Sequence, residues 1–142
     1  MRLVRRVSVE RPLETVFGYL SDFMTTEEWD PGTVSTVRVS GDGGVGTSYL
    51  NTSRFAGRET ELTYVVEELV PQRRFALRGA NRSVVAHDTM DFRWTGRATE
   101  VTYTAEFEFQ GVARLARVLL RPALKKLADD AEGGMRRALQ AL

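Results

Sequence analysis

The chain has 142 residues, a length typical of one hydrophobic core, so residues 1–142 are expected to form a single domain. Hydrophobic residues make up 42% and charged residues 27%, which excludes a disordered tail or a fibrous protein. Twenty basic against 19 acidic residues leave a net charge of +1, which argues against nucleic acid as a partner. With no cysteine and one histidine, neither disulfides nor a multi-histidine metal site is expected, and we predict no metal and no other cofactor.

The start of the chain has no features of a targeting segment. Residues 1–11 are broken by Arg2, Arg5, Arg6 and Glu10 and lack the apolar run of a secretory signal. No stretch approaches the roughly 20 apolar residues that a membrane span requires. We therefore expect a soluble cytoplasmic protein with no integral membrane association.

The N-terminal residues predict one strand and two short helices. Valines in residues 4–9 indicate a strand, and Pro12 suits the first position of a helix because its φ is fixed and it lacks a backbone donor. From Leu13 to Phe23 apolar residues recur at helical spacing. A second short helix must end before Pro31, because the residue before a proline avoids the α region.

Between residues 33 and 109 the apolar residues recur every second position, which predicts antiparallel strands joined by short turns. In the last strand, Val101, Tyr103, Ala105 and Phe107 share one face, and polar residues occupy the other. This strand is therefore expected to have one buried face and one solvent-exposed face. The six expected strands are residues 34–39, 47–55, 58–69, 73–79, 83–94 and 99–109.

After Gly111 the helical period returns and predicts one long helix of about 29 residues, roughly 43 Å in length. Pro122 removes a hydrogen bond inside it and is expected to produce a kink. Gly133 and Gly134 form a second weak point, since each costs about 1 kcal/mol relative to Ala. A helix bent around a cavity and a tolerated irregularity both fit this pattern. The expected buried stripe is Val112, Leu115, Leu119, Ala123, Leu127, Ala131, Ala138 and Leu142.

A basic stripe occupies another face of this helix. Arg114, Arg117, Arg121 and Lys125 follow one another at spacings of three and four residues. Such a stripe either forms a solvated face or approaches an anionic membrane or an acidic carrier protein. Both interpretations stay open at this point.

The order of elements predicts an α+β architecture. An antiparallel sheet with one apolar face needs a cover, and only the C-terminal helix is long enough to provide it. We expect a curved seven-stranded antiparallel sheet wrapped around this helix, with two short helices after the first strand. Leu and Ala on one helix stripe are expected to leave part of the concave face unfilled, which predicts a pocket. A fully packed core is the alternative.

Residues spread over the whole chain carry a family resemblance: Pro12, Glu14, Val16, Phe17, Tyr19, Leu20, Asp22, residues 29–32 (Trp-Asp-Pro-Gly), Gly44, Gly46, Thr47, Gly57, Glu68, Pro71, Arg74, Phe75, Thr99, residues 101–103 and Gly111. With these residues the chain resembles the START-like, helix-grip (SRPBCC) superfamily, and most of all its polyketide cyclase/dehydrase branch. The resemblance implies a helix-grip fold with a cavity for an apolar or amphipathic small molecule. It does not determine whether that molecule is carried, sensed or converted.

Two motifs are judged misleading. Residues 41–46 satisfy G-x-G-x-x-G, but a strand follows them instead of the helix that a dinucleotide site needs, so a hairpin connection is expected, with gating of a cavity as a remaining role. His87 alternates with apolar neighbours and is expected on the wet face. We therefore do not assign His87 as a general base.

Two acidic residues lie at strand positions whose side chains are expected to point to the apolar face. They are the candidate catalytic groups. Asp88 falls on the apolar face of its strand, and Glu68 shares parity with Tyr64 and Val66. If both lie opposite Phe75, their carboxylates are two strand spacings apart, roughly 9 to 10 Å. They would then orient ligand hydroxyls or act as acid and base with raised pKa values. Alternatively, they reach water near a sheet end or pair with an arginine.

The expected ligand contacts lie on the apolar faces of the strands and of the long helix. Two inward tyrosines offer phenol hydrogen bonds, although structural tyrosines are the alternative. The full expected set is Trp29, Leu62, Tyr64, Phe75, Leu77, Asp88, Met90, Phe92, Tyr103, Phe107, Leu119 and Ala123.

Three functions follow from these expectations. The first is a binding module for a small hydrophobic or amphipathic molecule, lipid-like or polyketide-like, held between sheet and helix. The second is a polyketide cyclase, aromatase or dehydratase that uses pocket carboxylates and tyrosines without a metal or redox cofactor. The third is a quinone-binding or protein-interaction module. Besides the small molecule, an acyl carrier protein or a second copy in a weak homodimer are the partners considered.

Overall fold

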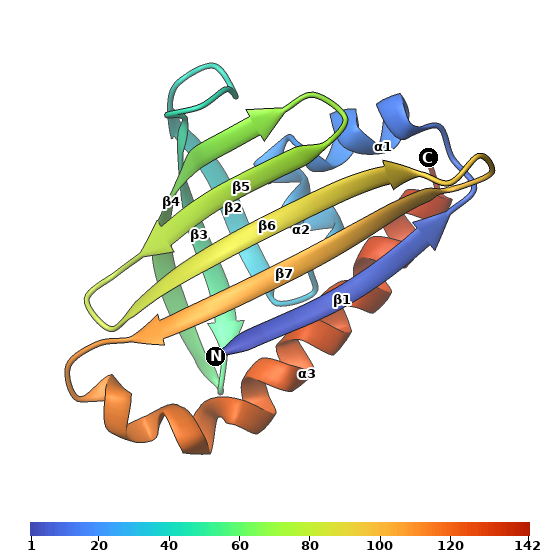
Figure 1. Ribbon diagram of the computed structural model, residues 1–142. Helices are drawn as coiled ribbons and strands as arrows, with labels where there is room; N and C mark the ends of the chain where they lie inside the picture. Colours follow the sequence, from blue (N-terminus) through green and yellow to red (C-terminus); the bar gives the residue numbers. More distant parts are fainter.

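The computed structural model describes residues 1–142 and places seven strands in one antiparallel sheet, with a long helix across its concave side (Figure 1). The α+β helix-grip architecture expected from the sequence is confirmed. The elements in chain order are β1 (Arg2–Val9), α1 (Leu13–Leu20), a short 3-10 helix η1 (Phe23–Thr25), α2 (Thr26–Trp29), β2 (Thr33–Ser40), β3 (Ser48–Phe55), β4 (Arg58–Val70), β5 (Arg74–Ala80), β6 (Val84–Trp94), β7 (Thr99–Phe109) and α3 (Ala113–Gln140).

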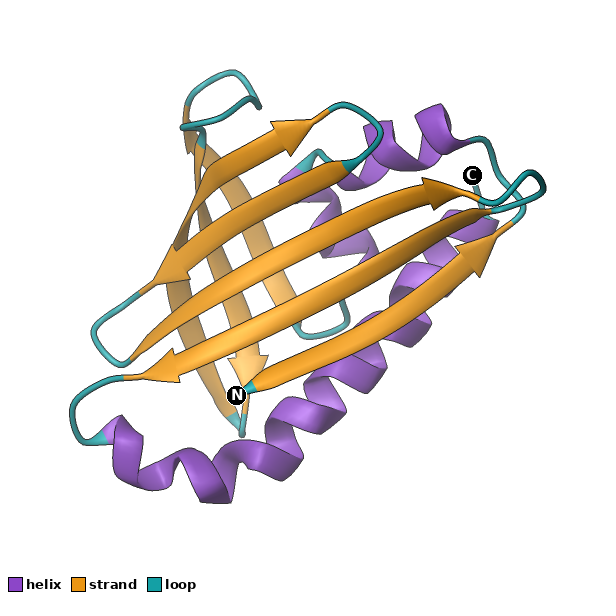
Figure 2. Cartoon of the chain, in the orientation of Figure 1, coloured by secondary structure: helices purple, strands orange, loops and turns teal.

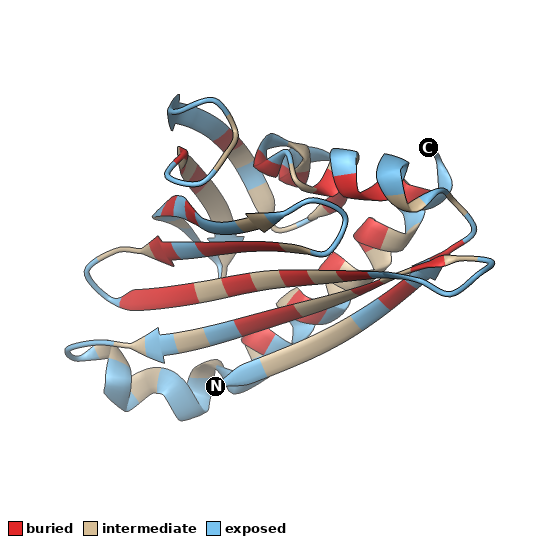
Figure 3. Cartoon of the chain, turned by 45° about the horizontal axis from the view of Figure 1, so that its top comes forward, coloured by how far each residue is buried: buried red, intermediate tan, exposed pale blue.

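The sheet follows the order β1-β7-β6-β5-β4-β3-β2, so every strand from β2 to β7 pairs with its neighbour in the chain. The first strand, β1, is added beside β7 and closes that edge. Figure 2 shows the sheet curving around the helices, which all lie on one side of it. In Figure 3 buried positions alternate with half-buried or exposed ones along the strands, and buried positions recur along α3.

Polar caps direct the chain from the first helices into the sheet. Asp22 accepts a hydrogen bond from the Met24 amide at 3.1 Å and so begins η1. After α2, Asp30 accepts bonds from the Gly32 amide and the Thr33 hydroxyl, both at 3.0 Å. These bonds turn the chain into β2 and hold the Asp30 carboxyl at the helix end, where it also lines the cavity described below.

The buried face of α3 differs from the stripe expected from the sequence. It consists of Leu124, Ala128, Ala131, Gly134, Met135 and Leu139. Of the expected residues, Val112, Leu115, Leu119 and Leu142 are exposed. A stripe built on steps of four residues rotates by about 40° per step on a helix of 3.6 residues per turn. Leu119 lies three such steps before Ala131 and Leu115 lies four. Both residues have therefore rotated out of the face of α3 that contacts the sheet.

The first turns of α3 run in a different direction from the rest of the helix, as Figure 1 shows at the bottom of the view. Pro122 lies inside the helix at this point, as the sequence predicted. No helix of the protein combines the length and apolar character needed to cross a bilayer.

Candidate functional site

A cavity of about 110 Å³ lies between the concave face of the sheet and α3. An apolar cavity of about 150 Å³ is enough to bind benzene, so the enclosed space suits roughly one ring or a short chain. Of the 21 residues that line it, 15 are hydrophobic. The remaining six include Thr26, Asp30, Asn51, Ser53 and Asp88. The site is therefore an apolar chamber with a few polar groups in its walls.

Asp88 is the central polar group of the cavity. It lies on β6 between Leu77 of β5 and Ala105 of β7, with its side chain inward and only 6% of the residue exposed. Burial raises the pKa of Asp88 to about 7. A hydrogen bond with Tyr64 lowers this pKa, the charge of Asp30 raises it, and a hydrogen bond with Tyr103 lowers it. At neutral pH this carboxyl therefore exists in both protonation states.

Two tyrosines flank Asp88 from opposite sides. Tyr64 comes from β4 and Tyr103 from β7, and both interact with the carboxyl through their hydroxyls. Burial, and next the charge of Asp88, raise the pKa of both phenols, so both remain protonated donors. The Tyr64 ring lies against Gly79, where an added Cβ would come within 2.6 Å of the ring. The missing side chain at Gly79 thus makes room for Tyr64.

Trp29 adds a donor that has no partner. The residue is 2% exposed and lines the cavity, and its indole Nε1–H is buried without a hydrogen bond. Its ring meets Tyr103 edge-to-face, with centroids 5.9 Å apart and an interplanar angle of 87°. Buried donors are nearly always paired, because leaving one unpaired costs about 1–3 kcal/mol.

A chain of hydrogen bonds forms a second polar wall. The Thr26 hydroxyl donates to the Phe23 carbonyl at 2.8 Å and lies 2.6 Å from the Thr36 hydroxyl. Thr36 also accepts from Asn51 Nδ2 at 2.8 Å, and the Ser53 hydroxyl donates to Asn51 Oδ1 at 2.7 Å. These bonds orient the Asn51 amide and leave its second Nδ2 hydrogen without a protein partner. The cavity thus presents polar groups from two sides.

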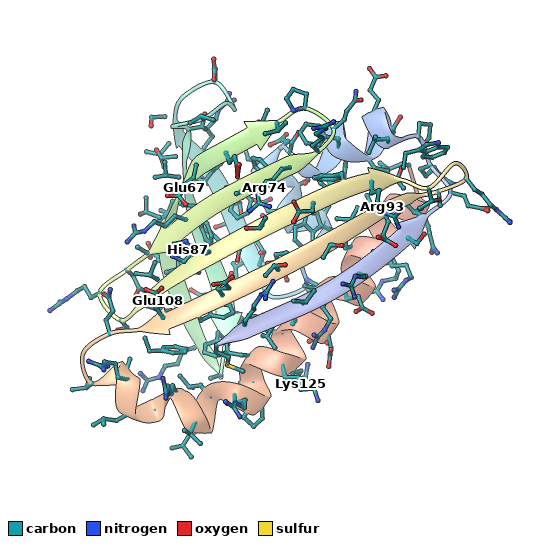
Figure 4. All side chains as sticks on the ribbon, viewed as in Figure 1. Glu67, Arg74, His87, Arg93, Glu108 and Lys125 are labelled. Carbon is teal, nitrogen blue, oxygen red and sulfur yellow. The ribbon has the colours of Figure 1, made fainter.

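Glu68 lies outside the cavity, so its predicted place beside Asp88 is wrong. The pairing of β4 with β5 shifts between Val66 and Glu68, which inserts one extra residue into β4. Such a bulge reverses the alternation beyond it, and Glu68 turns to the exposed face. There it accepts a hydrogen bond from Arg74 Nε at 2.7 Å, and Arg74 also binds Asp91 at 2.8 Å (Figure 4). The structure therefore has the alternative that the sequence left open, in which Glu68 pairs with an arginine.

The other expected contact residues divide into two groups. Trp29, Leu62, Tyr64, Tyr103 and Phe107 line the cavity with Asp88, and their contact with a ligand remains a prediction. The rest do not line it: Phe75, Leu77, Met90 and Phe92 belong to the packed core, Leu119 is exposed and Ala123 is half-buried.

The core group lies elsewhere because α1 fills that end of the concave face. Phe17 of α1 packs edge-to-face on Phe92 at 4.9 Å between centroids, and both belong to the packed core. Sequence reasoning missed Asp30, Asn51 and Ser53. For Asn51 a signal was present, because it lies two residues after the buried Tyr49 on β3 and therefore points to the same face.

The two motifs judged misleading have the expected structures. His87 lies on the outer face of β6, with its Nδ1 at 3.9 Å from Glu67 Oε1 (Figure 4). Residues 41–46 connect β2 to β3 in a hairpin, in which the Gly43 amide donates to the Thr47 hydroxyl at 2.8 Å. Neither feature forms part of the cavity wall.

Comparison with known proteins places this architecture in a family. Residues 1–142 match the family described as polyketide cyclase / dehydrase and lipid transport. Among solved structures, the Zhui aromatase/cyclase from Streptomyces sp. R1128 is similar with a TM-score of 0.85 at 15% identity, over 99% of this chain and 93% of that chain. No curated protein matches the sequence at a significant level.

Two further structures have the same fold. A protein of Thermus thermophilus has a TM-score of 0.84 at 16% identity, over 99% of this chain and 98% of that chain. A START superfamily protein from Mycobacterium smegmatis has a TM-score of 0.74 at 14% identity, over 99% of this chain and 94% of that chain. At these identities the likeness concerns the fold.

Proposed function

We propose that this chain, which belongs to the polyketide cyclase/dehydrase and lipid transport family, binds a small, mainly apolar molecule whose carbonyl or hydroxyl oxygen lies at Asp88. One observation carries the proposal: a buried acid, with no cationic partner, lies between two tyrosines in a mainly apolar cavity. An unpaired buried carboxyl destabilises a fold, and such groups are concentrated at functional sites. The ligand oxygen would gain several donors in one place.

The arrangement of donors supports a ligand with oxygen atoms rather than a hydrocarbon. The protonated Asp88 and the unpaired Trp29 indole can both donate to an acceptor, and a tyrosine hydroxyl can do so when it is not donating to the Asp88 carboxyl. Asn51, in the second polar wall, offers one more donor. A molecule with a single ring and one or two carbonyl groups fits both the volume and this polarity. The direct experiment is native mass spectrometry of the protein from its own cells, with a retained small molecule as the expected result.

Filling the cavity is expected to abolish binding. Ala128 is buried on α3 and lines the cavity, so Ala128→Phe would occupy the space that a ligand ring needs. The probe is Prodan, a neutral aromatic ketone fluorophore with two fused rings; its ketone-bearing ring would occupy the cavity and its second ring the opening, because the cavity is partly open. We expect the Prodan affinity to fall at least about tenfold, the effect of losing roughly 1.4 kcal/mol of contact. Ala123→Phe is the matched control, because Ala123 lies on the same helix but does not line the cavity. Equal Prodan affinity of Ala128→Phe and the unaltered protein would place the binding site elsewhere.

A second candidate function is a cyclase or dehydratase, and the pKa of Asp88 near 7 is the observation that favours it. In a dehydration, the Asp88 carboxylate would take the proton next to a ketone whose oxygen is bound by a tyrosine hydroxyl. The departing hydroxide would then recover that proton from Asp88 as water, which leaves an unsaturated ketone and the original carboxylate. No metal or redox step is needed for this sequence.

Asp88→Asn separates the two functions. Because an amide still donates a hydrogen bond but cannot accept a proton in catalysis, we expect Prodan binding to persist within a few-fold. Turnover of an aromatic β-hydroxy ketone, measured by the absorbance of the unsaturated product, is expected to fall by at least about a hundredfold, within the range for loss of an acid–base group. If the unaltered protein does not convert this substrate, the binding function alone remains; if Asp88→Asn retains full turnover, Asp88 is not the base.

A further inference from the structure

The N-terminal part of α3 exposes large apolar side chains that no part of the protein covers. Val112 is 88% exposed, Leu115 86%, Val118 69% and Leu119 81%. The side of this segment that faces the protein consists of residues that are only half-buried, Ala113, Ala116 and Leu120. At 100° per residue, Leu115 and Val118 point away from that side. Four neighbouring apolar side chains on one projecting helix are unusual on a protein that works without a docking partner.

The same segment carries the strongest local charge of the molecule. Residues 109–128 contain five basic residues and no acid, while the rest of the chain holds 15 basic and 19 acidic residues, a net charge of −4. Arg114, Arg117, Arg121 and Lys125 take part in no ion pair, whereas Lys126 pairs with Asp130 at 2.7 Å. These four cations are therefore available to a partner. In Figure 4 Lys125 lies on the outer side of α3, away from the sheet.

Charge and apolar surface are arranged as in a helix that lies in a membrane interface. On a helical projection, Leu115 and Leu119 are about 40° apart, and Val118 lies about 60° to 100° to one side of them. On that flank Arg114, Arg121 and Lys125 lie within about 60° of Val118. A basic stripe beside an exposed apolar stripe is the pattern by which helices bind anionic lipid surfaces. A projecting ridge of this kind inserts among lipid headgroups directly, whereas a protein partner would need a groove of matching shape.

We propose that residues 112–126 dock the protein onto an anionic lipid bilayer, with Leu115, Val118 and Leu119 inserted at the interface and the basic side chains on the lipid headgroups. The segment is continuous with the cavity wall on both sides. Phe107 and Phe109 precede it, Leu124 lies within it and Leu127 follows it. Docking would therefore bring the cavity rim against the bilayer, a path by which an apolar molecule passes between lipid and protein without crossing water. The docking surface itself is independent of which molecule the cavity holds.

Vesicle sedimentation with the full chain tests the docking surface. The protein is expected to bind vesicles of mixed phosphatidylcholine and phosphatidylglycerol, to bind pure phosphatidylcholine weakly, and to be released by added salt. Each neutralised cation near an anionic surface reduces the partition coefficient about fivefold. Arg114→Gln with Arg121→Gln should therefore weaken binding about 25-fold. Leu115→Ser with Leu119→Ser should reduce binding to the mixed vesicles to the level seen with phosphatidylcholine alone.

Matched controls come from exposed residues far from this segment in the fold. Arg38→Gln with Arg78→Gln removes the same charge, and Val37→Ser with Val39→Ser removes exposed apolar side chains from edge strand β2. Both controls are expected to bind mixed vesicles like the unaltered protein. Prodan binding without vesicles reports the cavity separately, so loss of docking and loss of ligand binding are distinguishable. The proposal is overturned if the unaltered protein does not bind mixed vesicles at low salt, if the two segment variants bind as well as the controls, or if the segment binds only an acidic carrier protein.

Discussion

Asp88→Asn is expected to make the protein more stable at pH 8 by about 2 to 4 kcal/mol and to change its stability little at pH 4. The pKa of Asp88 is about 7 in the folded protein, against an ordinary value of 3.8. Between pH 4 and pH 7 the folded state therefore binds more protons than the unfolded state, and the free energy of unfolding falls as the pH rises through this window. Three pKa units correspond to about 4 kcal/mol, and the uncharged amide avoids this loss.

Urea unfolding of both proteins at pH 4, 6 and 8 measures this effect. The gap in unfolding free energy between Asp88→Asn and the unaltered protein should widen with pH and level off above about pH 7. Glu61→Gln, an exposed carboxyl on β4, is the control and should show no such widening. A constant gap at all three values would mean that the Asp88 carboxyl is ionised throughout, and both its role as a donor and the proposed ligand chemistry would then have to be abandoned.

The loss in free energy of unfolding that the ionised Asp88 causes is informative about function. A buried asparagine or leucine at this position would suit a purely structural core better, because neither carries a charge that must leave water. Natural proteins retain such destabilising groups where binding or catalysis needs them. The cavity wall around Asp88 supplies donors and no cation, so the carboxyl is tuned toward its protonated form instead of being neutralised by a partner.

The sequence predicted the inward orientation of Asp88 correctly and that of Glu68 incorrectly for one physical reason. Strand β6 pairs without a shift against both neighbours, so simple alternation holds along its whole length. Strand β4 contains a bulge after Val66, and a single extra residue reverses the face of every residue beyond it. The two consecutive glutamates at 67 and 68 were the available signal, because strict alternation would have placed one of them in the core.

The position of the cavity was harder to predict than the fold. The order of strands and helices follows from the change in apolar spacing at Thr33 and again at Gly111, which is local information. Where free volume remains depends on which part of the concave face the other helices already fill. Because α1 packs on Phe92 at one end, the cavity lies at the other end, between Phe107 and Leu124. That division depends on contacts between residues far apart in the chain.

The close approach of α3 to the end of α2 depends on one glycine. Gly134 is buried at the point where α3 passes the end of α2, and a Cβ there would overlap the Trp29 carbonyl oxygen and come within 3.0 Å of Pro31 Cδ. Gly134→Ala is therefore expected to destabilise the protein by about 3 kcal/mol, even though alanine favours a helix by about 1 kcal/mol. The helix must move away from Trp29, whose ring forms part of the cavity wall, so Prodan affinity should fall as well.

Gly133→Ala is the matched control, one position earlier on the same helix. Its Cβ would meet only the end of the flexible Arg137 side chain, at 3.4 Å, so the helix propensity of alanine should raise stability by up to about 1 kcal/mol. Urea unfolding thus separates two neighbouring substitutions by roughly 4 kcal/mol with opposite signs. If both variants are equally stable, α3 does not depend on this contact for its position. A loss confined to Gly134→Ala, together with weaker Prodan binding, would show that the close approach of α3 to Trp29 determines both the stability of the fold and the shape of the cavity.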